Sequence, residues 1–324
     1  MKAKKSEFTV AVLSGGIGSE RQVSLQSGKS VAEAIAEAGF RVISADIRPD
    51  MLDILDDNRI NVFFPALHGQ FGEDGRLQQI LEDRGLLYVG SGPQASRLAF
   101  DKSAAKRAFV GAGIATPPEI SIDSEKAGDG LAEKLADFAD KYVIKPITQG
   151  SSVGVSIVDE PDRAAAVARE TFDRFGPCII EPFVRGRELT VGILDGKALP
   201  IIEIRPTDGF YDYDAKYLDD STQFVFDTIA DAKLVSNIQA VAIECFDALG
   251  CRHFARADFI LDDGGTAYAL EVNTIPGFTS HSLLPKAAAK AGMSMSDMCR
   301  RIVNMALVEG GYETHTELSQ RNEN

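Results

Sequence analysis

Several features that would place a chain outside the soluble globular class are missing from this sequence. No apolar run approaches the roughly 20 residues of a membrane-spanning helix, and the polar residues 1–7 contain no apolar signal-peptide core. The four cysteines include no Cys-x-x-Cys pair, which favours a reduced cytosol over a disulfide scaffold. No internal repeat or low-complexity block occurs. We therefore expect a cytoplasmic protein with no membrane partner.

Basic residues are outnumbered, and the formal net charge is −14. This charge argues against nucleic acid as a partner, because a phosphate backbone needs a basic surface, although it leaves local nucleotide binding open. The content of hydrophobic residues is 44% and that of charged residues 25%, both ordinary for a globular protein. A length of 324 residues allows about two or three domains.

The N-terminal part alternates between strand-like and helix-like segments. Apolar runs at residues 8–13, 42–45 and 62–67 predict strands, and the segments between and after them predict helices at residues 23–38, 51–55 and 77–84. This βαβ rhythm indicates a doubly wound, mostly parallel sheet in an α/β domain over residues 1–95. The turn Ser91-Gly92-Pro93 marks its end.

The rest of the chain predicts two α+β units. The first, residues 96–187, has predicted helices at 101–112 and 162–175 and strands at 142–146, 153–158 and 178–181. The second, residues 188–311, has further strands and helices at 231–249 and 295–308. It also contains a polar, tyrosine-rich loop at 207–221, which is either a lid or a solvated surface. Residues 312–324 form a polar tail.

Three oxygen-bearing side chains lie on a predicted hairpin near the C-terminus. Strands at residues 254–261 and 268–273 flank the turn Asp262-Asp263-Gly264-Gly265, so Asp258 comes near Glu271 and Asn273. Glu271 and Asn273 are two residues apart and therefore share one face of their strand. Carboxylate and amide oxygens suit Mg²⁺, which commonly accompanies phosphate. A solvated hairpin edge is the alternative, but it explains poorly an aspartate inside an apolar strand.

Two glycine-rich loops are candidates for anion binding. Gly16-x-Gly18 follows a strand, but Arg21 occupies the third glycine position of a dinucleotide fingerprint, which counts against a nicotinamide oxidoreductase. The loop Gly150–Gly154 follows Lys145 and either folds over phosphates or is a plain hairpin turn. His68 ends a strand where α/β sheets bind ligands, although a lone histidine is more often structural.

Taken together, these motifs resemble the D-alanine–D-alanine ligases of the ATP-grasp superfamily. The resemblance runs in order over about residues 8–308. It rests on Gly18-Ser19-Glu20-Arg21, Ala66-Leu67-His68-Gly69, Gly72-Glu73-Asp74-Gly75, Asp101-Lys102, Lys145-Pro146, Gly150-Ser151-Ser152-Val153-Gly154, Tyr211-Asp212-Tyr213, Ala215-Lys216-Tyr217, Glu271-Val272-Asn273-Thr274, Pro276-Gly277 and Thr279-Ser280-His281-Ser282-Leu283. It implies that the two α+β units form an ATP-grasp fold, the first its central domain and the second its larger C-terminal domain.

The resemblance also implies an activity. Such enzymes use ATP to join two D-alanines through an acyl phosphate, and the product serves peptidoglycan precursor synthesis. The implied cofactors are ATP and two Mg²⁺ ions, with Mn²⁺ as a substitute. The implied assembly is a homodimer.

Roles for individual residues follow from the same resemblance. The implied metal ligands are Asp258, Glu271 and Asn273. The implied ATP-binding residues are Lys102, Lys145, Ser151, Ser152, Glu181, Val184, Glu188 and Lys216. Glu20 would receive the ammonium of the first substrate, and Ser282 with Leu283 the carboxylate of the second. The implied catalytic residues are Glu20, Ser151, Tyr217, Arg256, Gly277 and His68.

Alternatives remain at this point. Tyr217 stands where relatives that form depsipeptides carry Phe, which favours a dipeptide product, while Gln22 and Gln149 replace a common Glu. A different amino-acid substrate for an ATP-grasp ligase is one alternative. A non-catalytic nucleotide-binding regulator is another, but it predicts losses among the lysines, Arg256 and the carboxylates, and all are present.

Overall fold

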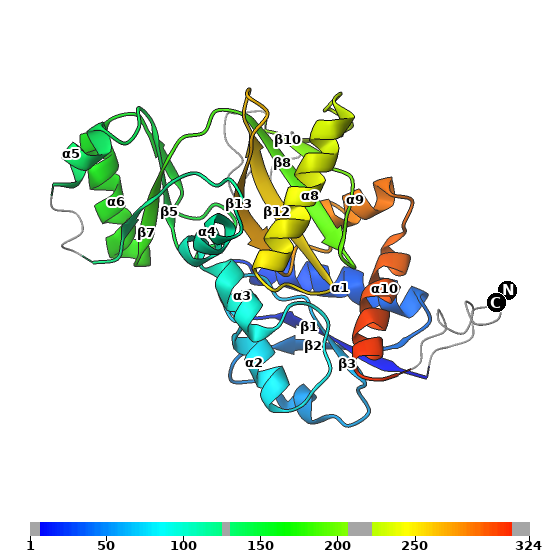
Figure 1. Ribbon diagram of the computed structural model, residues 1–324. Coiled ribbons are helices and arrows are strands. Elements are labelled where there is room, and N and C mark those ends of the chain that lie inside the picture. The colour runs from blue at the N-terminus through cyan, green and yellow to red at the C-terminus, as the bar shows by residue number, and fades with distance from the viewer. Residues whose placement is uncertain (1–6, 125–129, 207–221, 313–324) are drawn as a thin grey trace.

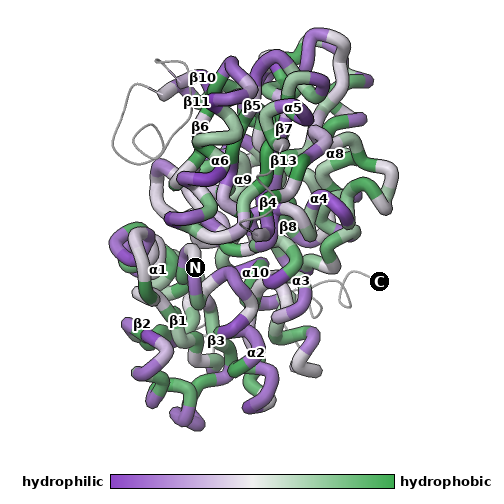
Figure 2. The backbone as a smooth tube through the Cα atoms, turned by 90° about the vertical axis from the view of Figure 1, so that its left-hand side faces the viewer, coloured by the Kyte–Doolittle hydropathy of each residue, from purple (hydrophilic) through white to green (hydrophobic). Residues whose placement is uncertain are grey.

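Three β-sheets organise the computed structural model, which describes residues 7–124, 130–206 and 222–312. The N-terminal sheet lies at one end of the molecule, and the other two sheets lie beside each other at the opposite end (Figure 1). A view from the side shows the same arrangement, with β1, β2 and β3 below and β5, β7 and β13 above (Figure 2).

The N-terminal sheet is parallel, in the order β2-β1-β3. Val10 and Val12 face a core shared with α1 and α10, whereas Ala11 and Leu13 face α2. Alternate residues of one apolar strand are therefore buried under helices on opposite faces, which confirms the doubly wound sheet. Its elements are β1 (Thr9–Gly15), α1 (Arg21–Glu37), β2 (Arg41–Ile47), the 3₁₀ helix η1 (Asp53–Asp56), β3 (Val62–Pro65), α2 (Arg76–Asp83) and α3 (Pro93–Phe100). The helix predicted at residues 51–55 is thus only this single short 3₁₀ segment.

The central sheet is antiparallel, in the order β4-β7-β5-β6. Tyr142, Ile144 and Ile180 pack under α5 and α6, whereas the residues between them, Val143, Lys145 and Glu181, point to the opposite face. The predicted strand at 153–158 is wrong at its beginning, because left-handed turn residues precede Ser156. The elements are α4 (Lys102–Gly111), β4 (Ile120–Ile122), α5 (Leu131–Ala136), β5 (Tyr142–Pro146), β6 (Ser156–Val158), α6 (Pro161–Phe175) and β7 (Cys178–Pro182).

The C-terminal sheet is antiparallel, in the order β11-β10-β8-β12-β13, with β9 paired to β8. Its elements are β8 (Arg187–Leu194), β9 (Lys197–Ala198), β10 (Ile202–Arg205), β11 (Gln223–Phe226), α8 (Ala232–Ala248), β12 (Phe254–Leu261), β13 (Ala267–Asn273), α9 (Leu283–Lys290) and α10 (Met295–Glu309). The predicted hairpin is confirmed as β12 and β13.

Alternation along β12 explains the aspartate inside this apolar strand. Ala255, Ala257 and Phe259 pack in the core under α8. The residues between them, Arg256 and Asp258, point to the other face. One strand thus supplies the core and a polar surface at once.

The last helix returns to the N-terminal sheet. Met298, Ile302 and Ala306 of α10 pack against α1 and β3 in one continuous core. None of the helices within the described ranges is long and apolar enough to cross a membrane.

Candidate active site

A pocket opens between the face of the central sheet that carries Val143, Lys145 and Glu181 and the polar face of the C-terminal sheet. Its apolar walls include Val143, Ile157 and Ile260, which suit a flat ring. Eight of the residues predicted from the sequence line this one pocket: Lys102, Lys145, Ser152, Glu181, Val184, Glu188, Asp258 and Glu271.

The register of the hairpin places the predicted metal ligands together. Asp258 pairs across the strands with Glu271, and Arg256 pairs with Asn273. All four side chains therefore share one face. The guanidinium of Arg256 donates to both oxygens of Asp258, over 3.0 and 2.9 Å, and Asn273 Nδ2 donates to Asp258 Oδ2 over 3.1 Å. Thr190 Oγ1, from the neighbouring strand β8, donates to Asp258 Oδ1 over 2.5 Å.

The donor set of this face fits a hard cation. Asp258 and Glu271 are adjacent carboxylates and Asn273 adds an amide, so all the donors are oxygens. Within the described ranges no cluster of three or more His, Cys, Asp and Glu side chains is arranged to hold a metal. A cation here would therefore rely on two carboxylates and the amide, and the metal role stays a prediction.

The two pocket lysines are each paired with a carboxylate. Lys102 Nζ lies 3.1 Å from Glu271 Oε2 and donates to the Gln149 carbonyl over 2.8 Å. Lys145 Nζ lies 2.6 Å from Glu181 Oε2. Each lysine ammonium thus neutralises one carboxylate in this structure. A phosphate could replace that carboxylate as the partner of the lysine.

The second glycine loop contacts the N-terminal domain. Ser151 and Ser152 have φ angles of 52° and 57°, a region that residues other than glycine seldom occupy, which marks a constrained loop. Ser151 Oγ donates to Glu20 Oε1 over 2.6 Å. A Cβ at Gly69 would lie 2.3 Å from Glu20 Oε2, so only glycine allows this approach.

The segment after β13 brings Gly277 and Ser282 together. A Cβ at Gly277 would lie 2.5 Å from Ser282 Oγ, so the side chain of Ser282 lies against the Gly277 backbone. Ser282 is also the N-cap of α9, and Leu283 is the first residue of that helix. A helix N-terminus presents free N–H groups, which suits the predicted carboxylate.

His68 is buried, with both ring nitrogens in hydrogen bonds. Nδ1 lies 3.0 Å from the Ile275 carbonyl, so this nitrogen carries the proton and donates it. Nε2 then accepts from Ser27 Oγ over 2.9 Å, and Ser27 Oγ in turn accepts from the Phe278 N–H over 3.2 Å. Burial lowers the pKa of His68 to about 4. The ring is therefore neutral at pH 7, and the catalytic role that the resemblance implies for His68 stays a prediction.

Comparison with known proteins now adds to this geometry. A family model described as the D-ala D-ala ligase C-terminus matches residues 111–304, and one for the N-terminus of the same ligases matches residues 50–91. A D-alanine–D-alanine ligase from Syntrophotalea carbinolica is 42% identical over 294 residues, which cover 91% of this chain and 94% of that protein. The chain belongs to the D-alanine–D-alanine ligase family. Its predicted family and enzyme class, an ATP-dependent ligase, are thereby confirmed.

Solved structures of the family agree with this assignment. The D-alanine–D-alanine ligase from Bacillus anthracis complexed with ATP superposes with a TM-score of 0.82 at 32% identity, covering 93% of this chain and 97% of that one. The VanG D-Ala:D-Ser ligase from Enterococcus faecalis gives a TM-score of 0.81 at 29% identity, covering 93% and 100%. The predicted ATP-grasp fold is confirmed.

Two predicted ligase residues, Lys216 and Tyr217, lie outside the described residues together with the loop at 207–221. Some residues that support the site were not predicted from the sequence. Thr190 donates to Asp258, and Ser27 hydrogen-bonds His68. Glu73 accepts from the Gly69 and Ile275 N–H groups, and Lys106 and Glu119 lie behind Glu181. Two of these had a signal in the sequence: Glu73 lies in the motif Gly72–Gly75, and Lys106 follows Lys102 by four residues and shares its helix face.

Proposed function

We propose that the chain joins two molecules of D-alanine into D-alanyl-D-alanine at the expense of ATP, for peptidoglycan precursor synthesis. The observation that carries this proposal is that one pocket is lined by both predicted phosphate lysines, Lys102 and Lys145, and by both predicted metal carboxylates, Asp258 and Glu271. Membership of the ligase family supports the same reaction.

ATP would lie between the central and C-terminal sheets. The apolar walls would take the adenine ring, Glu181 and the Val184 backbone its polar edge, and Glu188 the ribose hydroxyls. Lys102 and Lys145 would bind the α- and β-phosphates, with Ser151 and Ser152 in the covering loop and Lys216 at the γ-phosphate. Since both lysines already face this pocket, the phosphates would replace their present carboxylate partners.

The metal ligands in this proposal are Asp258, Glu271 and Asn273. When bound, Mg²⁺, or Mn²⁺ in its place, would neutralise charge on the phosphate oxygens. The residues of this chain orient the reactants around it. The hydrogen bonds from Arg256 and Thr190 hold Asp258 in place.

The chemistry proceeds in two steps. A carboxylate oxygen of the first D-alanine bonds to the γ-phosphorus as the bond to ADP breaks, giving an acyl phosphate. The amine of the second D-alanine then attacks the acyl carbon, loses a proton to solvent, and phosphate leaves with its bonding electron pair. The negative oxygen that develops on that carbon would be stabilised by Arg256 and the Gly277 N–H.

Substrate contacts complete the proposal. Glu20 would receive the ammonium of the first D-alanine, while Ser282 and the Leu283 N–H would receive the carboxylate of the second. Glu20, Ser151 and Tyr217 would tie the N-terminal domain, the covering loop and the loop at 207–221 together. The same proposal includes the domain limits 1–95, 96–187 and 188–311 and the polar tail. It also includes a homodimer and a cytoplasmic location without nucleic-acid or membrane partners.

A phosphate-release assay tests the reaction and its substrate. Purified protein with Mg-ATP should release phosphate only when D-alanine is added, and D-alanyl-D-alanine should accumulate in equal amount. D-Serine and D-lactate, each added with D-alanine, measure the specificity for the second substrate. No stimulation by D-alanine would overturn the proposal, and preferential formation of a mixed product would change its second substrate.

A further inference from the structure

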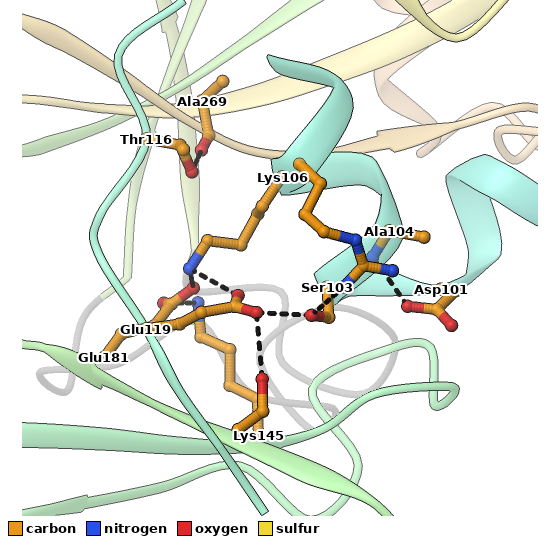
Figure 3. A network of polar contacts seen from close by, with 11 residues as sticks. Asp101, Ser103, Ala104, Lys106, Thr116, Glu119, Lys145, Glu181 and Ala269 are labelled. Atoms are coloured by element: carbon orange, nitrogen blue, oxygen red, sulfur yellow. Dashed lines mark hydrogen bonds and ion pairs between the residues drawn. The ribbon is translucent and has the colours of Figure 1, made fainter. Parts of the chain in front are cut away.

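Behind the pocket lies a group of buried charges of which the proposed function uses only Glu181. Lys106, on α4, points its ammonium between two carboxylates, Glu181 of β7 and Glu119 of the loop before β4 (Figure 3). Lys106 Nζ lies 3.1 Å from Glu119 Oε2 and donates to Glu181 Oε1. Ser103 donates to Glu119, and Arg107 Nη1 donates to Ser103 Oγ over 2.8 Å.

Glu181 is therefore held from two sides. Its other oxygen, Oε2, lies 2.6 Å from Lys145 Nζ. Val143 and Glu181 are direct neighbours across β5 and β7, and Lys145 lies two residues along β5 on the same face. Lys106 contacts Glu181 from behind the pocket, whereas Lys145 contacts it from within the pocket.

Burial makes these pairs obligatory. Lys106 is only 3% exposed and Glu181 only 2%, so neither could remain charged without a partner. Burial alone would raise the pKa of Glu181, but the charges of Lys145 and Lys106 outweigh it and lower this pKa below its usual value. The two lysines and two glutamates together carry no net charge.

The geometry points to Lys106 as a positioning residue that keeps Glu181 neutralised and in place, so that Lys145 is free to turn to the phosphates of ATP. This inference rests on the proposed roles of Glu181 and Lys145. Without Lys106, Lys145 would be the one cation left beside the buried Glu181 among the residues that the structure describes, and phosphate binding would have to compete with that pair.

The loop that carries Glu119 is itself anchored to the C-terminal sheet. Thr116 Oγ1 donates to the Ala269 carbonyl over 2.8 Å, and the Ala269 N–H donates to the Ala115 carbonyl over 2.8 Å. Glu119 thus holds the Lys106 ammonium from a loop that is itself fixed to β13 (Figure 3). A fixed ammonium can hold a carboxylate in one orientation better than a mobile one.

The test compares ADP binding, measured by calorimetry, with the thermal unfolding temperature. Lys106→Met should weaken ADP binding and raise KM for ATP by about tenfold or more, with kcat changed less than about threefold, and should lower the unfolding temperature. In the double variant Lys106→Met/Glu119→Gln one cation and one anion are removed together, so the cluster is neutral again. The double variant should regain the unfolding temperature but not the affinity for ADP.

A merely structural role of Lys106 predicts that both quantities recover together in the double variant, and this result would overturn the inference. Lys290→Met is the matched control, because Lys290 forms an exposed ion pair with Asp227 and does not line the pocket. It should leave ADP binding unchanged. If the wild-type protein itself neither binds ADP nor uses ATP, the proposed function fails instead.

Discussion

The proposed site has a nucleotide end, around Lys145 and Glu181, and a reacting end, around Gly277. Each end is held in place by a different kind of interaction. At the nucleotide end, Lys106 and Lys145 are paired with Glu181, and Lys102 with Glu271. At the reacting end, the segment that contains Gly277 is held mainly by uncharged donors and acceptors. These are Ser27, neutral His68 and the peptide groups of Ile275 and Phe278.

This difference matches what each end would bind. ATP carries several negative charges, and paired lysines can exchange a carboxylate for a phosphate with little change in local charge. The proposed oxyanion donor, the Gly277 N–H, would need a fixed direction, and the hydrogen bonds of the neighbouring Ile275 and Phe278 peptides would supply it. We therefore expect charge changes to alter nucleotide affinity and hydrogen-bond changes to alter turnover.

The largest loss of turnover is expected from a substitution of Arg256, where the two ends of the site meet. Arg256→Met removes the proposed oxyanion partner, which should lower kcat by about a hundredfold or more. It also removes both donors to Asp258 from this side chain. ADP affinity, measured by calorimetry, should fall much less than kcat. Equal losses in both would contradict the separation of the two ends, and turnover within about tenfold of wild type would remove Arg256 from the reaction.

A smaller loss of turnover is expected from Ser27→Ala, at the reacting end alone. The buried Phe278 N–H and His68 Nε2 would each lose their partner, at a cost of about 1–3 kcal/mol in the free energy of unfolding. The neighbouring Gly277 peptide would lose its fixed direction, so kcat should fall by about tenfold while KM for ATP stays within about twofold.

Ser236→Ala is the matched control for Ser27→Ala. The Ser236 hydroxyl donates only to the Ala232 carbonyl on the exposed side of α8, so this variant should match wild type in stability and rate. A Ser27→Ala protein with lower stability but wild-type kcat would limit the hydrogen-bond chain to a structural role.

The smallest effect on turnover at neutral pH is expected from the titration of His68, which instead makes the stability depend on pH. The pKa of His68 is about 4 in the folded protein, against about 6.5 in an unfolded chain. The unfolded state therefore binds more protons between these values. The contribution of His68 is complete above pH 6.5 and is lost as the pH falls towards 4, by about 3 kcal/mol in total.

Urea unfolding of wild type and His68→Asn between pH 7 and pH 4 measures this contribution. The stability difference between the two proteins should shrink as the pH falls. His281→Asn, which removes an exposed ring, should follow the wild-type curve. A constant difference between wild type and His68→Asn would mean that His68 is not kept neutral by burial.

The sequence was sufficient to predict the parts of the fold that depend on local patterns. The turn at Asp262–Gly265 between two apolar runs predicted the β12–β13 hairpin, and its register brings Asp258 and Glu271 together as expected. The motif order identified the eight predicted residues that line one pocket, although they range from Lys102 at the start of α4 to Asp258 in the middle of β12.

The parts of the site that the sequence did not predict depend on contacts between residues far apart in the chain. Ser27 and Phe278 are separated by 251 positions and Lys106 and Glu181 by 75, and no local pattern joins them. The strand predicted at 153–158 begins too early, because Gly154 has a φ of 75° and the Val155 N–H donates to the Ser152 carbonyl in a turn.

The most direct test of the proposed chemistry follows an isotope from substrate to product. D-Alanine labelled with ¹⁸O in its carboxylate is incubated with the protein, Mg²⁺ and ATP, and the released phosphate is analysed by mass spectrometry. Attack of the carboxylate on the γ-phosphorus predicts one ¹⁸O atom in each phosphate formed with D-alanyl-D-alanine. Dipeptide formation with unlabelled phosphate would contradict the acyl-phosphate route.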